Sequence, residues 1–192
     1  MEEKQIKPFV KEGCILLRSG KYLDLVDPDP NLITIYDIAH ALSYLCRYTG
    51  HTERFYSVAE HSLWVCLILP DHLKLEGLLH DASEAYLGDL SSPLKSLVPQ
   101  YRNLEDRMNY TIRNNFNLPF STSPEVAKAD LIMLGLERKK LLPPTEEQWG
   151  ILCGLESQID RLEYAFNPPF VSPEDMELEF LREFFRITDT NP

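Results

Sequence analysis

The chain has 192 residues, of which 44% are hydrophobic, so it can bury the core of one globular domain. No apolar run approaches the roughly 20 residues that span a bilayer, and the N-terminus lacks the basic and apolar layout of a secretory signal. A net charge of −11 opposes binding to a polynucleotide backbone, which needs clustered Lys and Arg. We therefore expect a cytoplasmic protein (host cytoplasm if the source is viral) that binds neither membranes nor polynucleotides.

The first predicted element is a short β-hairpin, formed by two apolar runs on either side of Ser19-Gly20. Pro28 and Pro30 interrupt regular structure after it, and from Thr34 onward the pattern is helical. The predicted helices lie near residues 35–48, 58–69, 71–87, 101–116, 124–141, 146–165 and 173–187. The pattern therefore predicts an all-α fold with a small N-terminal β-hairpin.

Helix starts are marked by capping sequences. Ser57-Val-Ala-Glu60 and Thr145-Glu-Glu-Gln148 both match a capping box, in which the first side chain accepts a hydrogen bond from the backbone three residues later. Ser123-Pro124 and Ser172-Pro173 each place proline at the first helical position behind a capping serine.

The segment from Gly77 to Asp89 carries the most informative pair, His80 and Asp81, between apolar residues that predict a buried helix. Burying an imidazole and a carboxylate together is costly unless a partner compensates them, and a divalent cation is such a partner. Glu84 follows Asp81 by three residues and His80 by four, on the same helical face. A second carboxylate therefore lies beside the predicted metal.

Two other helices each supply one residue of a metal-binding type, His61 in an apolar helix and Asp130 among apolar neighbours. Taken singly, such a histidine is more often a hydrogen-bonded core residue, and such an aspartate a cap or ion-pair member. The joint order His…His-Asp…Asp favours a metal site. His40 is interpreted as a core or supporting residue, and the run Glu137-Arg-Lys-Lys140 as a solvated helix face.

This order resembles the metal motif of the HD-domain phosphohydrolase superfamily. Ser57–Ser62, His80–Asp89, Pro93-Leu-Lys95 and Ala127-Lys-Ala-Asp130 look like segments of its bacterial 5′-deoxyribonucleotidases, whereas Asp37–Thr52 is similar to its phage dATP triphosphohydrolases. The match spans residues 20–141. We therefore expect one HD-type helical domain over residues 1–192, with a C-terminal helical extension from about residue 142.

The resemblance implies a role for each matching residue. His61, His80, Asp81 and Asp130 would hold a divalent ion (Mn, Co, Mg, Zn or Fe), Glu84 would orient or deprotonate the attacking water, and Asp89 would assist the leaving group or contact the sugar. Side chains that would form a basic nucleotide pocket are Arg47, His51, Arg54 and Lys95, with Tyr48 where the relatives carry an aromatic residue, often Trp. These relatives form dimers or larger assemblies, so a homo-oligomer is expected.

Two substrate modes remain open. The Arg47–Thr52 block favours release of triphosphate from a dNTP, with dATP preferred, and this is the leading interpretation. The Glu84 and Asp89 pair favours release of phosphate from a dNMP. The number of cations in the pocket would separate them, because a triphosphate needs more neutralisation. An HD-type nuclease and a non-catalytic nucleotide-binding regulator are lesser alternatives, since a basic strip is absent and no ligand is missing.

Overall fold

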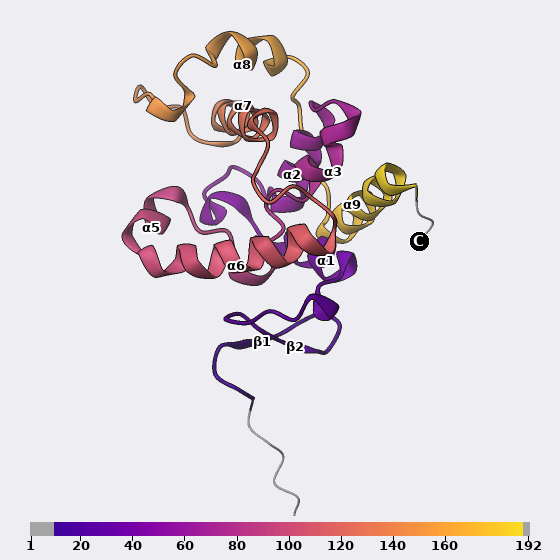
Figure 1. Cartoon of the computed structure of the whole chain (residues 1–192). Helices are drawn as coiled ribbons and strands as arrows, with labels where there is room; N and C mark the ends of the chain where they lie inside the picture. Colours follow the sequence, from indigo (N-terminus) through magenta and orange to yellow (C-terminus); the bar gives the residue numbers. More distant parts are fainter. Residues whose placement is uncertain (1–9, 190–192) are drawn as a thin grey trace, which may run out of the picture.

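The computed structural model describes residues 10–189, which are mostly helical with one two-stranded hairpin near the N-terminus. The expected fold class is therefore confirmed at that level. The N-terminal stretch in which no secretory signal is expected lies largely outside these residues. In Figure 1 the hairpin lies at one end of the molecule, below α1. Between residues 10 and 189, no helix is long and apolar enough to cross a membrane.

The hairpin pairs β1 (Cys14–Leu16) with β2 (Tyr22–Asp24) in antiparallel register, with Ile15 opposite Leu23. Gly20 has a φ of 80° in the connecting turn, a conformation that glycine adopts without steric cost. The Ser19 amide donates to Asp37 Oδ1 at 2.8 Å, which ties the turn to the first helix.

The helical part follows in chain order. The α-helices are α1 (Ile35–Tyr44), α2 (Val58–Leu67), α3 (Lys74–Leu78), α4 (Glu84–Leu87), α5 (Ser92–Leu97), α6 (Pro99–Asn115), α7 (Pro124–Leu141), α8 (Glu156–Glu163) and α9 (Pro173–Thr188). Short 3₁₀ helices lie at η1 (Pro30–Leu32), η2 (Arg47–Gly50), η3 (Asp71–Leu73) and η4 (Gly150–Leu152).

Two of the predicted caps form, and two do not. The Ser57 side chain accepts from the Glu60 amide, and that of Ser172 from the Asp175 amide. Ser123 precedes α7 as predicted but makes no side-chain cap, because its hydroxyl donates to Glu76 Oε2 at 2.6 Å instead. The capping box predicted at Thr145 was wrong, since residues 143–149 are irregular and the predicted helix 146–165 is reduced to α8.

Three other boundaries differ from the prediction. The helix predicted over 71–87 is divided into η3, α3 and α4, with a turn at residues 79–83. The helix predicted over 35–48 ends at Tyr44, where the chain leaves for an isolated β-bridge between Cys46 and Ser57. Helix α5 was missed, because six residues that begin with Ser-Pro are too short for a periodic pattern.

Helix α2 lies between two apolar clusters, which explains why its sequence is apolar around most of its circumference. Val58, Ala59 and Cys66 contribute to a cluster shared with α1, α6 and α9, while Val65 contributes to a cluster shared with α7 and α8. Helix α9 packs against α1, α2 and α3, and α8 packs on α7 (Figure 1). Helices α8 and α9 of the C-terminal extension thus contribute to the two apolar clusters on either side of α2, the helix that carries His61.

Candidate metal centre

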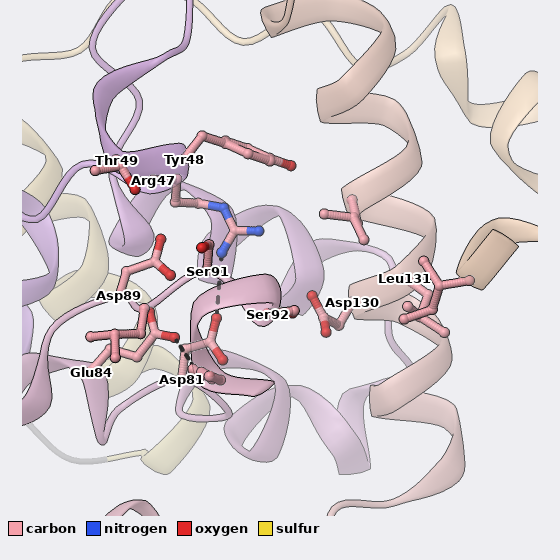
Figure 2. Close-up of a pocket in the computed structure, with 14 residues that line it drawn as sticks. Arg47, Tyr48, Thr49, Asp81, Glu84, Asp89, Ser91, Ser92, Asp130 and Leu131 are labelled. Atoms are coloured by element: carbon pink, nitrogen blue, oxygen red, sulfur yellow. Dashed lines mark ion pairs between the residues drawn. The ribbon is translucent and has the colours of Figure 1, made fainter. Parts of the chain in front are cut away.

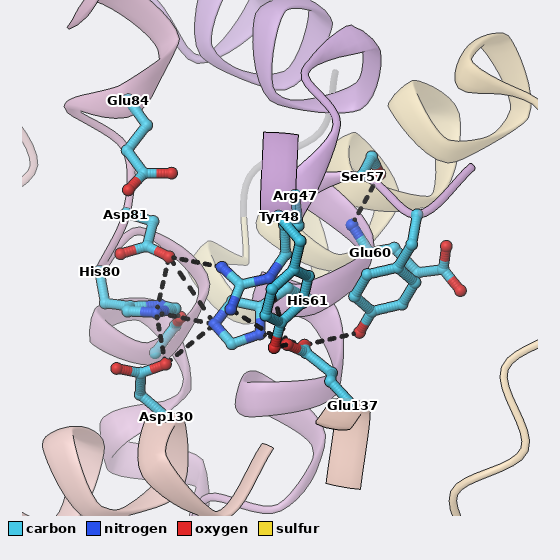
Figure 3. Close-up of polar contacts among 12 residues, drawn as sticks. Arg47, Tyr48, Ser57, Glu60, His61, His80, Asp81, Glu84, Asp130 and Glu137 are labelled. Carbon is cyan, nitrogen blue, oxygen red and sulfur yellow. Dashed lines mark hydrogen bonds and ion pairs between the residues drawn. The ribbon is translucent and has the colours of Figure 1, made fainter. Parts of the chain in front are cut away.

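Helix α2 places His61 at the middle of the molecule. Its side chain is completely buried, and its Nε2 lies 3.1 Å from Asp130 Oδ1 of α7 (Figure 3). The two helices pack against each other, so the apolar residues around both side chains hold them together.

The turn at residues 79–83 brings in the adjacent pair. His80 Nε2 lies 3.3 Å from His61 Nε2 and 3.9 Å from Asp130 Oδ1. Asp81 Oδ2 lies 3.2 Å from His80 Nε2 and 3.7 Å from His61 Nε2. Successive side chains on an α-helix point about 100° apart, so the break in the helix allows both residues to reach one point.

The three shorter separations, 3.1, 3.2 and 3.3 Å, fit coordination of a single ion. Ligand atoms 2.0–2.2 Å from a common metal lie roughly 3.0–3.6 Å apart, depending on the coordination geometry. His61, His80 and Asp130 each offer one ligand atom, and these atoms all lie within 4.8 Å of one another. Asp81, the fourth residue that the sequence predicts as a ligand, is not part of this group of three but lies beside its two histidines.

The hydrogen bonds of the two imidazoles orient their ligand nitrogens. His80 Nδ1 lies 2.8 Å from the Gly77 carbonyl, which can only accept, so Nδ1 carries a proton and Nε2 of the neutral ring has a free lone pair. His61 Nδ1 lies 2.5 Å from Glu137 Oε1, which fixes the same tautomer. When both rings are neutral, two nitrogen lone pairs lie beside two carboxylates, an arrangement that a cation satisfies.

The electrostatics favour positive charge at this point. Burial lowers the pKa of His61, but Glu137 and Asp130 outweigh it and raise the pKa to about 9. The pKa of His80 is also raised, against burial, chiefly by Asp81. Burial raises the pKa of Asp130, yet its hydrogen bond to His61 and the nearby histidines lower it overall. The group of His61, His80, Asp81 and Asp130, which we call the metal cluster, thus attracts either protons or a metal ion.

Glu137 was missed as a site residue, and its interpretation as part of a solvated face was wrong. Its side chain is fully buried. Oε1 accepts from the hydroxyl of Tyr56 at 3.0 Å. Oε2 accepts from the hydroxyl of Tyr48 at 2.7 Å and from Arg47 Nη2 at 3.0 Å (Figure 3). The sequence did contain a signal for this role: Glu137 follows Asp130 by seven residues, or two helical turns, and so lies on the same helical face.

A pocket of about 210 Å³ opens beside the cluster (Figure 2). Five of the residues predicted for catalysis or substrate binding line it, together with Asp81 and Asp130. They are Arg47, Tyr48, Glu84, Asp89 and Lys95.

Glu84 begins α4 and is only 6% exposed. Its Oε2 has no hydrogen-bond partner among residues 10–189, and Oε1 lies 3.6 Å from Lys95 Nζ. Burial, then repulsion from Asp81 and Asp89, raise the pKa of this carboxyl well above its usual range. Such a buried group can exchange a proton near neutral pH when a nearby cation offsets the repulsion.

Arg47 and Tyr48 reach the pocket from η2. The Arg47 side chain is buried, with Nη1 3.6 Å from Asp81 Oδ2 and Nε 3.2 Å from Glu137 Oε2. Tyr48 and Thr49 both have φ near +54°, a left-handed conformation that costs free energy in residues other than glycine. Strain of this kind is concentrated at functional sites in proteins.

Two predicted pocket residues lie elsewhere. His51 is exposed and is not part of the pocket lining. The Arg54 guanidinium donates to Glu60 Oε1 at 2.9 Å and to the Pro168 carbonyl at 3.0 Å, so it holds α2 against the segment before α9. The expected basic pocket of four side chains is therefore reduced to Arg47 and Lys95.

No protein-family model matches this chain. The uncharacterized protein YfdR of Escherichia coli strain K12 is 42% identical over 139 residues, which are 71% of this chain and 77% of YfdR. The uncharacterized protein RCAP_rcc00048 of Rhodobacter capsulatus is 36% identical over 159 residues, 76% of this chain and 81% of that protein. The chain therefore belongs to the protein family that includes YfdR and RCAP_rcc00048.

Proposed function

We propose that this protein is a metal-dependent phosphohydrolase of the HD-domain type that acts on deoxyribonucleotides. The observation that carries the proposal is the convergence of two histidine nitrogens and two aspartate carboxylates beside a pocket that is lined by the buried carboxylate of Glu84. The resemblance of the surrounding sequence segments to HD-domain nucleotidases supports the substrate class.

The residues divide the chemistry between them. His61, His80, Asp81 and Asp130 would hold the ion, which when bound would polarise the phosphoryl group and activate water. Glu84 accepts the proton of the attacking water, and the positive charge of Lys95 favours the ionised form of the Glu84 carboxyl. Arg47, fixed by Glu137, presents a guanidinium to the phosphate oxygens, and Asp89 faces the same pocket for the leaving group or sugar.

The charges favour a monophosphate over a triphosphate substrate. Within residues 10–189 the pocket is lined by two cations, Arg47 and Lys95, and by four carboxylates. Lys95 is also paired with Glu105, at 2.6 Å. A triphosphate carries more negative charge than a monophosphate, and fewer cations line the pocket than its neutralisation requires. We therefore place 5′-deoxynucleotidase activity first and dNTP triphosphohydrolase activity second, which reverses the order expected from sequence.

Product analysis tests this function. The protein would be reconstituted with Mn, Co, Mg or Zn and incubated with each dNMP and each dNTP, and the products separated by chromatography. Free phosphate from dNMPs is the expected result, whereas triphosphate plus deoxynucleoside would establish the second candidate. A protein that binds metal but releases neither product would overturn the proposed substrate class.

Glu84→Gln is the matched catalytic variant, since it keeps the side-chain shape and removes the proton acceptor. We expect its kcat to fall at least 100-fold while metal binding is retained. Unchanged kcat in this variant would remove Glu84 from the mechanism.

A further inference from the structure

The pocket beside the metal cluster has an aliphatic patch along α7 and η4. Leu131 and Leu134 come from α7, which also carries Asp130, and Ile151 comes from η4. Arg47, Glu84, Asp89 and Lys95 line the pocket from other segments. Figure 2 shows Leu131 on the α7 side of the pocket, away from Arg47 and Asp89. We refer to Leu131, Leu134 and Ile151 as the aliphatic wall.

The segment that carries Ile151 is anchored to α7. Leu152 is 8% exposed and packs with Trp149 into the second apolar cluster, and the Arg138 guanidinium of α7 lies 5.2 Å from the Trp149 ring centre. Ile151 itself stays 60% exposed. Its neighbours thus position an uncovered aliphatic side chain at the edge of the pocket.

The wall begins beside the metal cluster, because Leu131 and the predicted ligand Asp130 both line the pocket from α7. A ligand whose anionic end binds at the cluster therefore has its remaining part against aliphatic side chains. A nucleotide has such an anionic end and a part suited to aliphatic contacts, since its charged phosphate is joined through a sugar to a flat base with an apolar face. The three wall side chains offer contact area but no donor or acceptor for the base edges.

We propose that the aliphatic wall contacts the nucleobase and that Ile151 is a specificity-determining residue. This inference rests on the proposed function and assigns a role to the segment after Leu142. The protein then selects phosphate esters that carry a base over those that do not, and it discriminates weakly among the four bases.

The test is equilibrium binding to the metal-loaded, full-length protein. The probes are non-hydrolysable phosphonate analogues of dAMP and of deoxyribose 5-phosphate, in which a methylene group replaces the ester oxygen. Wild type is compared with Ile151→Ala and with Leu178→Ala, a control on α9 whose leucine is 52% exposed and lies outside the pocket lining.

We expect Ile151→Ala to weaken binding of the dAMP analogue by roughly fivefold and to leave the sugar analogue unchanged. Leu178→Ala should change neither. Equal affinity of wild type for the two analogues, or equal weakening of both by Ile151→Ala, would overturn the role of the wall while leaving the proposed function intact. Failure of wild type to bind either analogue would overturn both.

Discussion

At the scale of single residues, Glu137 links the cluster of His61, His80 and Asp130 to the pocket beside it. One of its oxygens holds the ring of His61, and the other holds Arg47 and Tyr48, which line the pocket. Burial opposes ionisation of this carboxyl, but Arg47 and His61 lower its pKa to about 2. A negative charge is therefore maintained behind His61 throughout the neutral range.

Glu137→Gln tests this link. The amide keeps the size of the side chain but loses the charge that stabilises the orientation of His61. We expect Mn²⁺ affinity to fall by about 10- to 100-fold, the usual effect of removing a group that orients a ligand. Isothermal titration calorimetry would measure it.

Glu60→Gln is the matched control, because Glu60 is also buried and also paired with an arginine, Arg54, but no hydrogen bond joins it to His61 or His80 within residues 10–189. Its Mn²⁺ affinity should stay within about twofold of wild type, since it is outside the group that orients the ligands. Equal losses in both variants would show that Glu137 acts through stability alone.

Metal binding should depend on pH in a defined direction. In the metal-free protein the His61 pKa of about 9 means that the imidazole is protonated at neutral pH, so a metal ion must displace a proton. Affinity for Mn²⁺ should therefore rise as pH increases from 6.5 toward 9. Titrations across this range would reveal it, and an affinity that is constant or falls with pH would contradict the account.

At the scale of elements, the site depends on how α3, α6 and α7 are held together. Glu76 of α3 accepts from Arg113 Nη2 of α6 at 2.6 Å and from the Ser123 amide, which precedes α7, at 2.8 Å. These three residues join the chain just before His80 to the start of the helix that carries Asp130. The contact fixes the position of the helix that leads into the turn at residues 79–83.

Glu76→Gln should destabilise the fold by about 3 kcal/mol, because it leaves the buried Arg113 charge without its carboxylate. Urea unfolding followed by circular dichroism would measure the change. The control is Glu179→Gln, which removes an exposed pair with Arg182 and should cost less than about 0.5 kcal/mol. A Glu76→Gln protein as stable as this control would show that the buried pair does not hold the helices.

At the scale of the whole molecule, the sequence predicted those features that depend on the pattern of apolar and polar residues along the chain. The hairpin follows from two apolar runs around Ser19-Gly20, and the main helices from their helical pattern. The gathering of His61, His80, Asp81 and Asp130 follows from polar side chains in otherwise apolar segments. Their binding of a metal stays a prediction. The break at residues 79–83 was not predictable from periodicity, because the same apolar pattern suits a continuous helix.

The positions of the basic side chains near the pocket were also not predictable from the sequence. Whether Arg47, His51 or Arg54 faces the pocket depends on the path of the loop between α1 and α2, where Tyr48 and Thr49 adopt left-handed conformations. Arg54 instead pairs with Glu60 and also donates to the Pro168 carbonyl, 114 residues further along the chain. Contacts over such separations are set by the assembled fold and leave no local sequence signal.

The most direct test of the account is a titration of the metal-free, full-length protein with Co²⁺, followed by its visible absorption spectrum. Wild type is compared with His80→Ala and with His40→Ala, whose histidine is half-buried, pairs with Glu177 at 2.8 Å and lies outside the cluster. We expect one tightly bound ion in wild type and in His40→Ala, and at least a 100-fold weaker site in His80→Ala. Equal Co²⁺ binding by all three proteins, or none by wild type, would contradict the assignment of the cluster as a metal centre.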